Sequence, residues 1–374
     1  MNKKEVKKAP ALRFKGFTND WEQRKLGDYG SVAMNKRIFK NQTNTNSGVP
    51  FYKIGTFGKK ADAFISKKLF EEYRKKYPYP KKGDLLISAS GSIGRVIEYT
   101  GQQAYYQDSN IVWLNHNDNL ENIYLKAYYQ IIHWSGIEGS TIERLYNKNI
   151  LNTKIYVPIK DEQFKVGTII DQIEKLITLQ QRKLESFQFT YHEIIRRLFL
   201  KKAKWQQTKL SDLVTILDKN RKPVKKEDRL FGDTPYYGAN GIQDYISGFT
   251  HKGEFILIAE DGANSLTEYP IYFVKGQIWV NNHAHVLKIN KDVSPLFLAL
   301  ALKQINYSKY TVGSSRNKLN LKDLENIAIF IPDNNEQQRI GQFYSNYLNY
   351  LRINKKRIQY MKQFKQFLLQ NMFI

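Results

Sequence analysis

The sequence has no cysteine, few acidic residues and no long apolar run. The absence of cysteine excludes disulfide frameworks, thiolate metal sites and a cysteine nucleophile. The longest apolar stretches, such as Phe255–Ala259, are far too short to cross a bilayer, so we expect no membrane partner. The charged start MNKKEVKKAP is unlike a signal peptide, and we interpret residues 1–16 as a basic tail of a cytoplasmic protein.

What is abundant is positive charge. The 59 lysines and arginines against 35 acidic residues give a formal net charge of +24. Such an excess predicts a polyanion as partner, and nucleic acid is the most common one. Any single basic cluster is better interpreted as solvated surface, and only the total excess favours nucleic acid. Hydrophobic residues make up 41% of the 374 residues, which is enough to build the cores of about two or three domains.

An internal repeat organises the chain. The string that begins at Trp21 (WEQRKLGD) returns at Trp205 (WQQTKLSD), 184 residues later. Further along, the offset settles at 174 residues, as between Pro158 and Pro332. Other matches in the same order are Pro50–Tyr52 with Pro235–Tyr237, Gly83–Ile87 with Gly253–Leu257, Leu145 with Leu319, and Gly167 with Gly341. Matches that keep their order over the whole chain indicate a tandem duplication.

Each repeat is predicted to end in a long helix. Apolar residues alternate at spacings of four and three, as in the seam of a coiled coil. In the first copy they are Val166, Ile170, Ile173, Ile177, Leu184, Phe187, Tyr191, Ile194 and Leu198, with Gln180 in the same stripe. Adding 174 gives the second stripe, from Ile340 to Met372, which only Asn354 and Lys365 interrupt. A helix over residues 162–200 would be about 58 Å long.

The two helices most simply pack against each other in antiparallel directions. Gln180 and Asn354 are equivalent by the repeat, and we expect them to face each other and fix the register. The alternative is that each helix packs on its own domain. The globular parts have the pattern of mixed α/β domains, with strands such as 84–88 and 111–114 and helices over 120–134 and 295–305.

Catalytic signatures are missing from the sequence. It contains no phosphate-binding GxxxxGK[ST] loop and no Asn-Pro-Pro-aromatic tetrapeptide of amino-methyltransferases. His283 and His285 form a His-x-His pair, but no third ligand is evident nearby, so we expect a strand with alternating side chains and no metal. The glycine-rich loop Ser88–Gly94 suits either a phosphate cradle or an ordinary tight turn.

Polar and basic residues at matched positions of both repeats are the candidates for DNA contact. Arginine, asparagine, glutamine, serine and histidine can reach base edges, and lysine mainly holds phosphates. The first set is Lys36, Arg37, Ser90, Ser92, Arg95, Gln107, Ser109, Asn110, Arg144, Asn147 and Lys148. The second set is Arg221, Lys222, Asn240, Asn264, Asn281, Asn282, His283, His285, Ser314, Ser315, Arg316, Asn317 and Lys318. In the second loop Glu260 and Asp261 replace Ser90 and Gly91, which would repel phosphate or accept from a cytosine amino group.

The order of domain, helix, domain, helix resembles the specificity subunit of type I restriction–modification systems. The strings LRFKGF (12–17), GDLLIS (83–88) and GEFILIA (253–259) carry the resemblance, together with the Pro-x₃-Glu-Gln pattern at Pro158 and Pro332. It implies target-recognition domains at 17–158 and 204–332 and spacer helices at 159–203 and 333–374.

The resemblance also implies the partners and the division of labour. Two modification subunits would methylate adenine with S-adenosylmethionine, and two restriction subunits would supply ATP- and Mg-dependent translocation and cleavage. This chain would bind no cofactor and would recognise double-stranded DNA without catalysing a reaction. Each domain would read one half of a bipartite, asymmetric target in a major groove. Helix faces with Phe189 and Ile195 would dock the partners. An autonomous RNA-binding protein and an enzyme with an unrecognised site are the alternatives.

Overall fold

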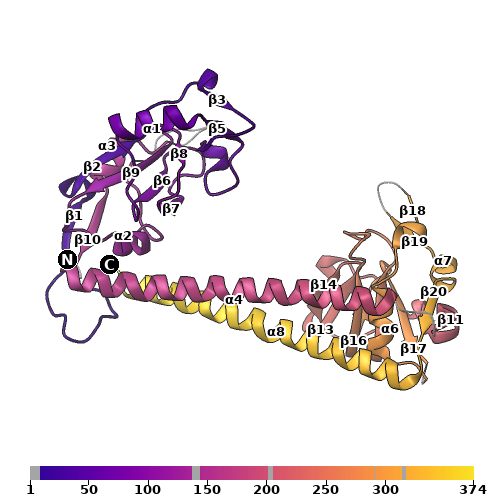
Figure 1. Ribbon diagram of the computed structural model, residues 1–374. Helices are drawn as coiled ribbons and strands as arrows, with labels where there is room; N and C mark the ends of the chain where they lie inside the picture. The colour runs from indigo at the N-terminus through magenta and orange to yellow at the C-terminus, as the bar shows by residue number, and fades with distance from the viewer. Residues whose placement is uncertain (1–8, 137–143, 201–204, 291, 314–316) are drawn as a thin grey trace. The chain divides into compact units, whose positions relative to one another are not determined.

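The computed structural model describes residues 9–136, 144–200, 205–290, 292–313 and 317–374. They form two compact units, one of residues 1–181 with 357–374 and one of residues 182–356. Two long helices, α4 (Lys160–Leu200) and α8 (Asn334–Asn371), each contribute one half to either unit (Figure 1). The predicted mixed α/β fold with long helices is confirmed.

The first unit contains two four-stranded sheets and a separate strand pair. The sheets have the orders β2-β9-β6-β7 and β3-β5-β4-β8, and β1 pairs with β10. The strands are β1 (Glu22–Lys25), β2 (Gly30–Met34), β3 (Thr43–Asn44), β4 (Val49–Tyr52), β5 (Ala63–Ile65), β6 (Leu85–Ser88), β7 (Val96–Glu98), β8 (Tyr105–Tyr106), β9 (Ile111–His116) and β10 (Lys154–Val157). The helices before α4 are α1 (Lys67–Lys76), α2 (Asn122–Tyr128) and α3 (Asn147–Asn152).

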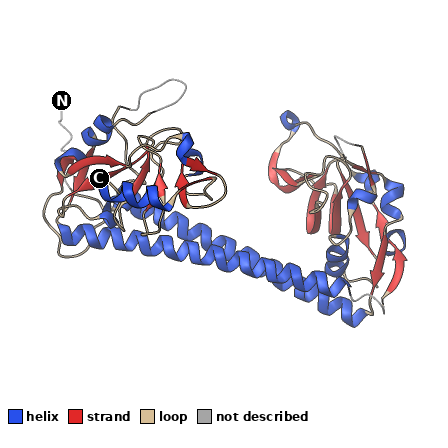
Figure 2. Ribbon diagram, turned by 45° about the horizontal axis from the view of Figure 1, so that its top comes forward, coloured by secondary structure: helices blue, strands red, loops and turns tan. Residues whose placement is uncertain are grey.

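The second unit contains one six-stranded sheet, of order β12-β17-β15-β16-β13-β14, whose strands are red in Figure 2. Its strands are β12 (Val214–Ile216), β13 (Phe231–Gly238), β14 (Gly241–Ile246), β15 (His251–Ala259), β16 (Ile271–Val280) and β17 (Ala284–Ile289). Two strand pairs stand apart, β11 (Gln206–Lys209) with β20 (Ala328–Ile331) and β18 (Thr311–Val312) with β19 (Lys318–Leu319). The short helices are α5 (Leu210–Leu213), α6 (Pro295–Leu302) and α7 (Leu321–Glu325).

The strand pairings confirm the duplication. The pair β1–β10 returns as β11–β20, and the order β2-β9-β6-β7 returns as β12-β17-β15-β16. The parallel pairing of Phe51 with Tyr105 returns as Tyr236 with Trp279. Strand β16 pairs with both β15 and β13. In the first unit two separate strands make the equivalent pairings, β7 with β6 and β8 with β4. One long strand therefore joins in the second unit the two sheets that are separate in the first.

The Glu-Gln pattern proves to be the anchor of each long helix. Gln163 accepts from the backbone N–H of Glu121 at 2.9 Å and donates to the carbonyl of Pro158 at 3.0 Å. Gln337 makes the same two contacts, with the N–H of Ser294 at 3.0 Å and the carbonyl of Pro332 at 3.1 Å. Both glutamines are buried, so each satisfies backbone groups that water does not reach.

The far ends of the helices enter the units in matching ways. Phe199, near the end of α4, packs edge-on against Trp205 in the second unit. Phe373, 174 residues later, packs edge-on against Trp21 in the first. The end of α4 and the segment directly after α8 therefore each supply an aromatic side chain to the core beside the repeated tryptophan.

Within each unit the two long helices pack in antiparallel directions. In the second unit Tyr191 stacks on Tyr347 with ring centroids 3.4 Å apart, and Phe187, one turn earlier, contacts Tyr350. In the first unit Lys365, which interrupts the apolar stripe, bonds Glu174 at 2.6 Å. Asn354 donates to the carbonyl of Tyr350, and its pairing with Gln180 stays a prediction.

Some predicted details need correction. The helix expected over residues 120–134 ends at Tyr128. After it, the N–H groups of Gln130 and Ile131 donate to carbonyls three residues earlier, as in a 3-10 helix. The seam predicted through Ile194 and Leu198 shifts by one residue, because the last turns of α4 pack into the core of the second unit. Ile195 and Phe199 are buried there, while Ile194 is 47% exposed. The helices thus pack both on each other and on the globular core.

Candidate nucleic-acid interface

Three separate segments of the first unit meet at one place. They are the loop after β6, the loop before β9 and the segment before α3. Ala89 donates its N–H to the carbonyl of Asn110 at 2.8 Å, and Leu145 donates to the carbonyl of Ala89 at 2.9 Å. A cavity of about 370 Å³ lies beside this junction. Five predicted contact residues line it: Ser109, Asn110, Arg144, Asn147 and Lys148.

The loop after β6 is a tight turn. Ile93, Gly94 and Arg95 all donate their N–H groups inside the loop, to Gly91 and Ser88. These groups are therefore not directed at an outside phosphate, and the structure favours the tight-turn interpretation over the phosphate cradle. The Ser90 hydroxyl donates to the side chain of Asn110 at 2.8 Å, which fixes the orientation of both groups.

The other candidates in the first unit surround this junction. Gln107 accepts from the N–H of Ile54, so its amide helps to hold the loop. Arg37 is 61% exposed and bonds Asp108 at 2.8 Å. Lys36 lies over the ring of Tyr77, with Nζ 5.1 Å from the centroid. Residues Ser92 and Arg95 complete the set on the loop after β6.

The second unit repeats this junction with different side chains. Glu260 donates its N–H to the carbonyl of His283 at 2.9 Å, and Leu319 donates to the carbonyl of Glu260 at 2.7 Å. Asp261 forms a bridge with Lys318, as Ser90 does with Arg144, so Asp261 corresponds to Ser90 and the predicted match of Glu260 with Ser90 is shifted by one residue. Both units thus hold the three segments with the same backbone bonds and differ in what those segments present.

A charged network lies beneath the second junction. His285 is 2% exposed and bonds Asp218 through Nδ1 at 2.6 Å and the carbonyl of Leu319 through Nε2 at 2.9 Å. Arg221 binds Glu260 at 2.7 Å and lies 3.4 Å from Asp218. Burial alone would raise the pKa of Asp218, but the hydrogen bond with His285, the N–H of Val286 and the charge of Arg221 together outweigh it and lower that pKa. Arg221 and His285 therefore support the loop, and their contact with DNA stays a prediction.

The same network bears on metal binding. Asp218 and Glu260 lie near His285, with one potential ligand atom from each within 4.8 Å of the others. The sequence showed no such neighbours, because they are separated along the chain by 25 or more residues. Arg221 and Lys318, with Lys318 Nζ 3.5 Å from Glu260, already neutralise these carboxylates. The cluster therefore has the character of a salt-bridge network.

Glu260 and Asp261 both contact other side chains of the second unit. Glu260 is engaged by Arg221, and Asp261 lies 2.6 Å from Nδ1 of His283. Both carboxylates are thus held by neighbouring side chains, and their effect on a phosphate or on a cytosine amino group stays a prediction. Asn240 has a supporting part, because its side chain bonds Gly262 and Asn264 and closes a turn.

A second cavity of about 500 Å³ opens next to this junction. Asn281, Asn282 and His283 line it, as the repeat predicted for this segment. Sequence reasoning missed the other polar side chains, which are Lys225, Arg229, Tyr236 and Gln243. Arg229 lies over the Tyr236 ring at 4.2 Å and bonds Asp244 at 3.3 Å. The basic run around Lys225 was the only signal in the sequence that pointed to this place.

Some candidates lie elsewhere or outside the described residues. Ser314, Ser315 and Arg316 fall outside the part that the structure describes. Asn317 and Lys318 directly follow that gap, and Lys318 begins β19. Lys222 is exposed, while its carbonyl accepts from the indole N–H of Trp279 at 2.7 Å.

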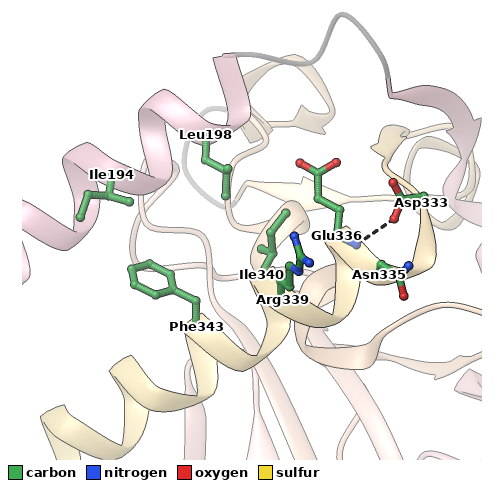
Figure 3. Close-up of a pocket in the computed structure, with 8 residues that line it drawn as sticks. All are labelled: Ile194, Leu198, Asp333, Asn335, Glu336, Arg339, Ile340 and Phe343. Carbon is green, nitrogen blue, oxygen red and sulfur yellow. Dashed lines mark hydrogen bonds between the residues drawn. The ribbon is translucent and has the colours of Figure 1, made fainter.

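A third cavity, of about 600 Å³, lies between the end of α4 and the start of α8 in the second unit (Figure 3). Ile194, Leu198, Ile340 and Phe343 give it an apolar floor, and Glu336 and Arg339 add charge. Asp333, directly before α8, caps the helix by accepting from the N–H of Glu336 at 2.9 Å. In the described residues no helix has the length and apolar character needed to cross a membrane.

Comparison with known proteins agrees with this architecture. The family model for the "type I restriction modification DNA specificity domain" matches residues 18–187 and again 202–363. A putative type I restriction enzyme specificity subunit of Haemophilus influenzae is 55% identical over 152 residues, 40% of each chain. The type I restriction enzyme MjaVIII specificity subunit of Methanocaldococcus jannaschii is 24% identical over 180 residues, 45% of this chain and 42% of that one. These matches span less than half of either relative.

A solved structure extends the likeness of the fold to nearly the whole chain. The type I restriction-modification S subunit from M. genitalium has a TM-score of 0.70 and 17% identity, over 98% of this chain and 99% of that one. The doubled family match covers most of the sequence and coincides with the internal repeat. The chain therefore belongs to the family of type I restriction-modification DNA specificity proteins.

Proposed function

We propose that this chain is the DNA-recognition subunit of a type I restriction–modification complex and that each unit reads one half of a bipartite target. One observation carries the proposal. Both units hold three loops with the same backbone bonds, and each presents a different set of polar side chains there. A shared frame with different side chains is what two readers of different short sequences require.

Base reading is assigned to the side chains around the two cavities. In the first unit these are Arg144 and Asn147, and in the second Asn281, Asn282 and His283. Arginine suits guanine and asparagine suits adenine in the major groove. Lysines near them, such as Lys148 and Lys225, are assigned to phosphates, where they add salt-dependent affinity that does not depend on sequence.

The remaining parts of the account concern boundaries and partners. We assign residues 17–158 and 204–332 to target recognition and residues 159–203 and 333–374 to the spacer helices. Two modification subunits that use S-adenosylmethionine and two restriction subunits that use ATP and Mg would supply all catalysis, in the cytoplasm. The chain itself is assigned no reaction. The alternative of an autonomous RNA-binding protein receives no support from the family match.

The partner subunits are expected to dock on the exposed apolar face of the helices. Phe189 is 71% exposed on α4 and fits this role, whereas Ile195 is 2% exposed and belongs to the core. The cavity of Figure 3 offers a second apolar surface where the helices meet. An exposed patch of this kind on a soluble domain marks an interaction site.

Selection from a random library of DNA duplexes tests the function. The chain, purified with its modification subunit, should enrich two short fixed blocks of unlike sequence, separated by a constant number of unselected positions. A single block, or tight binding of structured RNA without any duplex, would contradict the proposal.

A further inference from the structure

The second unit carries an unusual apolar pair at the start of β13. Phe231 is 92% exposed and Leu230 is 76% exposed, the highest values among the large hydrophobic side chains of the described residues. They are neighbours in sequence and stand at one end of the six-stranded sheet. Two adjacent large apolar side chains with this exposure leave a contiguous apolar surface that a partner could cover.

This pair belongs to a firmly bonded strand. Ser247 donates its N–H to the carbonyl of Leu230 at 2.8 Å. Phe231 and Thr234 both pair with Ile246, so β13 contains a bulge between them. A bulge redirects the side chains beside it, and this one accompanies the outward position of Phe231.

Gly232 makes this bulge possible. A Cβ at this position would lie 2.5 Å from the N of Ser247 and 2.6 Å from the carbonyl carbon of Ile246. Any other residue would push the two strands apart. The outward position of the two apolar side chains is therefore built into the backbone.

The pair lies next to the cavity of the second unit. Lys225 and Lys226 are exposed just before it, and Glu227 and Asp228 balance their charge. Arg229, the residue directly before Leu230, lines the cavity that also holds Asn282 and His283. The pair therefore borders the surface to which we assign base reading.

The equivalent positions of the first unit hold no such pair. Pro50 and Pro235 are equivalent by the repeat, so Leu230 and Phe231 correspond to Thr45 and Asn46. Both of these residues are polar, and Thr45 donates its hydroxyl to the Asn46 side chain. The apolar pair is a property of the second unit.

We propose that Leu230 and Phe231 form a wedge that inserts between stacked base pairs of duplex DNA beside the half-site read by the second unit. Proteins that deform DNA use phenylalanine and leucine in this way, unstacking one step and kinking the duplex. The proposal rests on the proposed DNA-reading function. Such a wedge favours a deformable step, and it therefore adds sequence preference at positions that no polar group contacts.

Fluorescence of 2-aminopurine tests the wedge. The chain with its modification subunit is bound to duplexes of the selected target, with 2-aminopurine placed in turn at each position in and beside the second half-site. The wild type should raise the fluorescence at one step. Phe231→Ala should abolish that rise and weaken binding about tenfold, the loss of one stacking contact. Phe231→Trp should retain both. Phe249→Ala, another exposed aromatic of the second unit, is the matched control and should change neither.

The outcomes distinguish a failure of the wedge from a failure of the proposed DNA recognition. If the wild type binds the duplex without unstacking any step, or if Phe231→Ala keeps the unstacking, the wedge is refuted while DNA recognition stands. If Phe231→Ala unstacks DNA normally but loses the modification subunit on gel filtration, the pair is a protein contact and the wedge is also refuted. If the wild type binds no duplex at all, the proposed function itself fails.

Discussion

At the scale of single residues, the second unit shows how buried carboxylates are paired with basic side chains. Asp218 joins three contacts, with His285, Arg221 and the N–H of Val286. These contacts keep β17 in line with the loop that carries Glu260. Because Arg221 contacts both Asp218 and Glu260, these two carboxylates can lie beside a proposed DNA surface.

Asp218→Asn should destabilise the second unit. It leaves Arg221 and His285 without their shared carboxylate, at a cost of about 3 kcal/mol in the free energy of unfolding at pH 7. The pKa of Asp218 is lowered in the folded state, so its stabilisation is fully present above the ordinary value near 3.8 and is lost as the pH falls through the folded value. Urea unfolding at pH 7 and at pH 3 measures both effects.

The matched control is Asp233→Asn, an exposed carboxylate of the same unit. We expect it to change stability by less than about 0.5 kcal/mol. Equal stability of the two variants at pH 7 would refute the structural role of Asp218. A difference between them that stays constant down to pH 3 would refute its low pKa.

Part of the site could be predicted at this scale. Asn281, Asn282 and His283 stood out because the repeat aligns them with residues 107–110. Arg229 and Gln243 were missed because they reach the same cavity from the segment before β13 and from β14. No local sequence pattern indicates a contact that forms only when the chain folds. His285 was a candidate because the repeat matches its segment to residues 107–110, and that match does not show that its side chain is buried.

At the scale of elements, the long helices were the most predictable part. The heptad stripe identified both, because their apolar residues meet one partner over many turns. It failed at the last turns of α4, where the partner changes from a helix to a globular core. The merged sheet of the second unit was not foreseen, because sequence periodicity does not tell one long strand from two short ones.

Gln337→Ala should loosen the start of α8. The change leaves the N–H of Ser294 and the carbonyl of Pro332 unsatisfied in a buried place, which costs about 2 kcal/mol in the free energy of unfolding. Gln342→Ala on the same helix serves as the control, since that exposed side chain bonds only Asn346. Thermal unfolding compares the two, and equal midpoints would contradict the anchoring role.

At the scale of the whole molecule, the two repeats are alike in frame and unlike in detail. Glu162 binds Arg13 of the N-terminal segment at 2.6 Å, whereas its counterpart Glu336 accepts from Trp205 at 3.2 Å. In the first unit the N-terminal segment therefore contacts the start of α4 through Arg13. Among the described residues, no equivalent arginine contacts Glu336 at the start of α8. A duplicated chain can in this way offer two partners unequal surfaces.

The spacer helices should set the unread distance in the target. Insertion of seven residues after Gln181 in α4 and after Lys356 in α8 lengthens each helix by about 10.5 Å, close to three base pairs. We expect the spacing between the two blocks to grow by about that amount, with both blocks unchanged. Selection from a random duplex library reads the spacing directly, and an unchanged spacing would refute the role of the helices as a spacer.

The central claim is that each unit reads its own half of one target. Sequencing that maps methylated adenines genome-wide, in cells that produce the chain with its modification subunit, tests it most directly. The wild type should mark one bipartite sequence. Asn282→Ala should relax or abolish recognition in one block, and Arg144→Ala should do so in the other block. If either variant alters both blocks, or if neither alters any, the assignment of one reader to each half is contradicted.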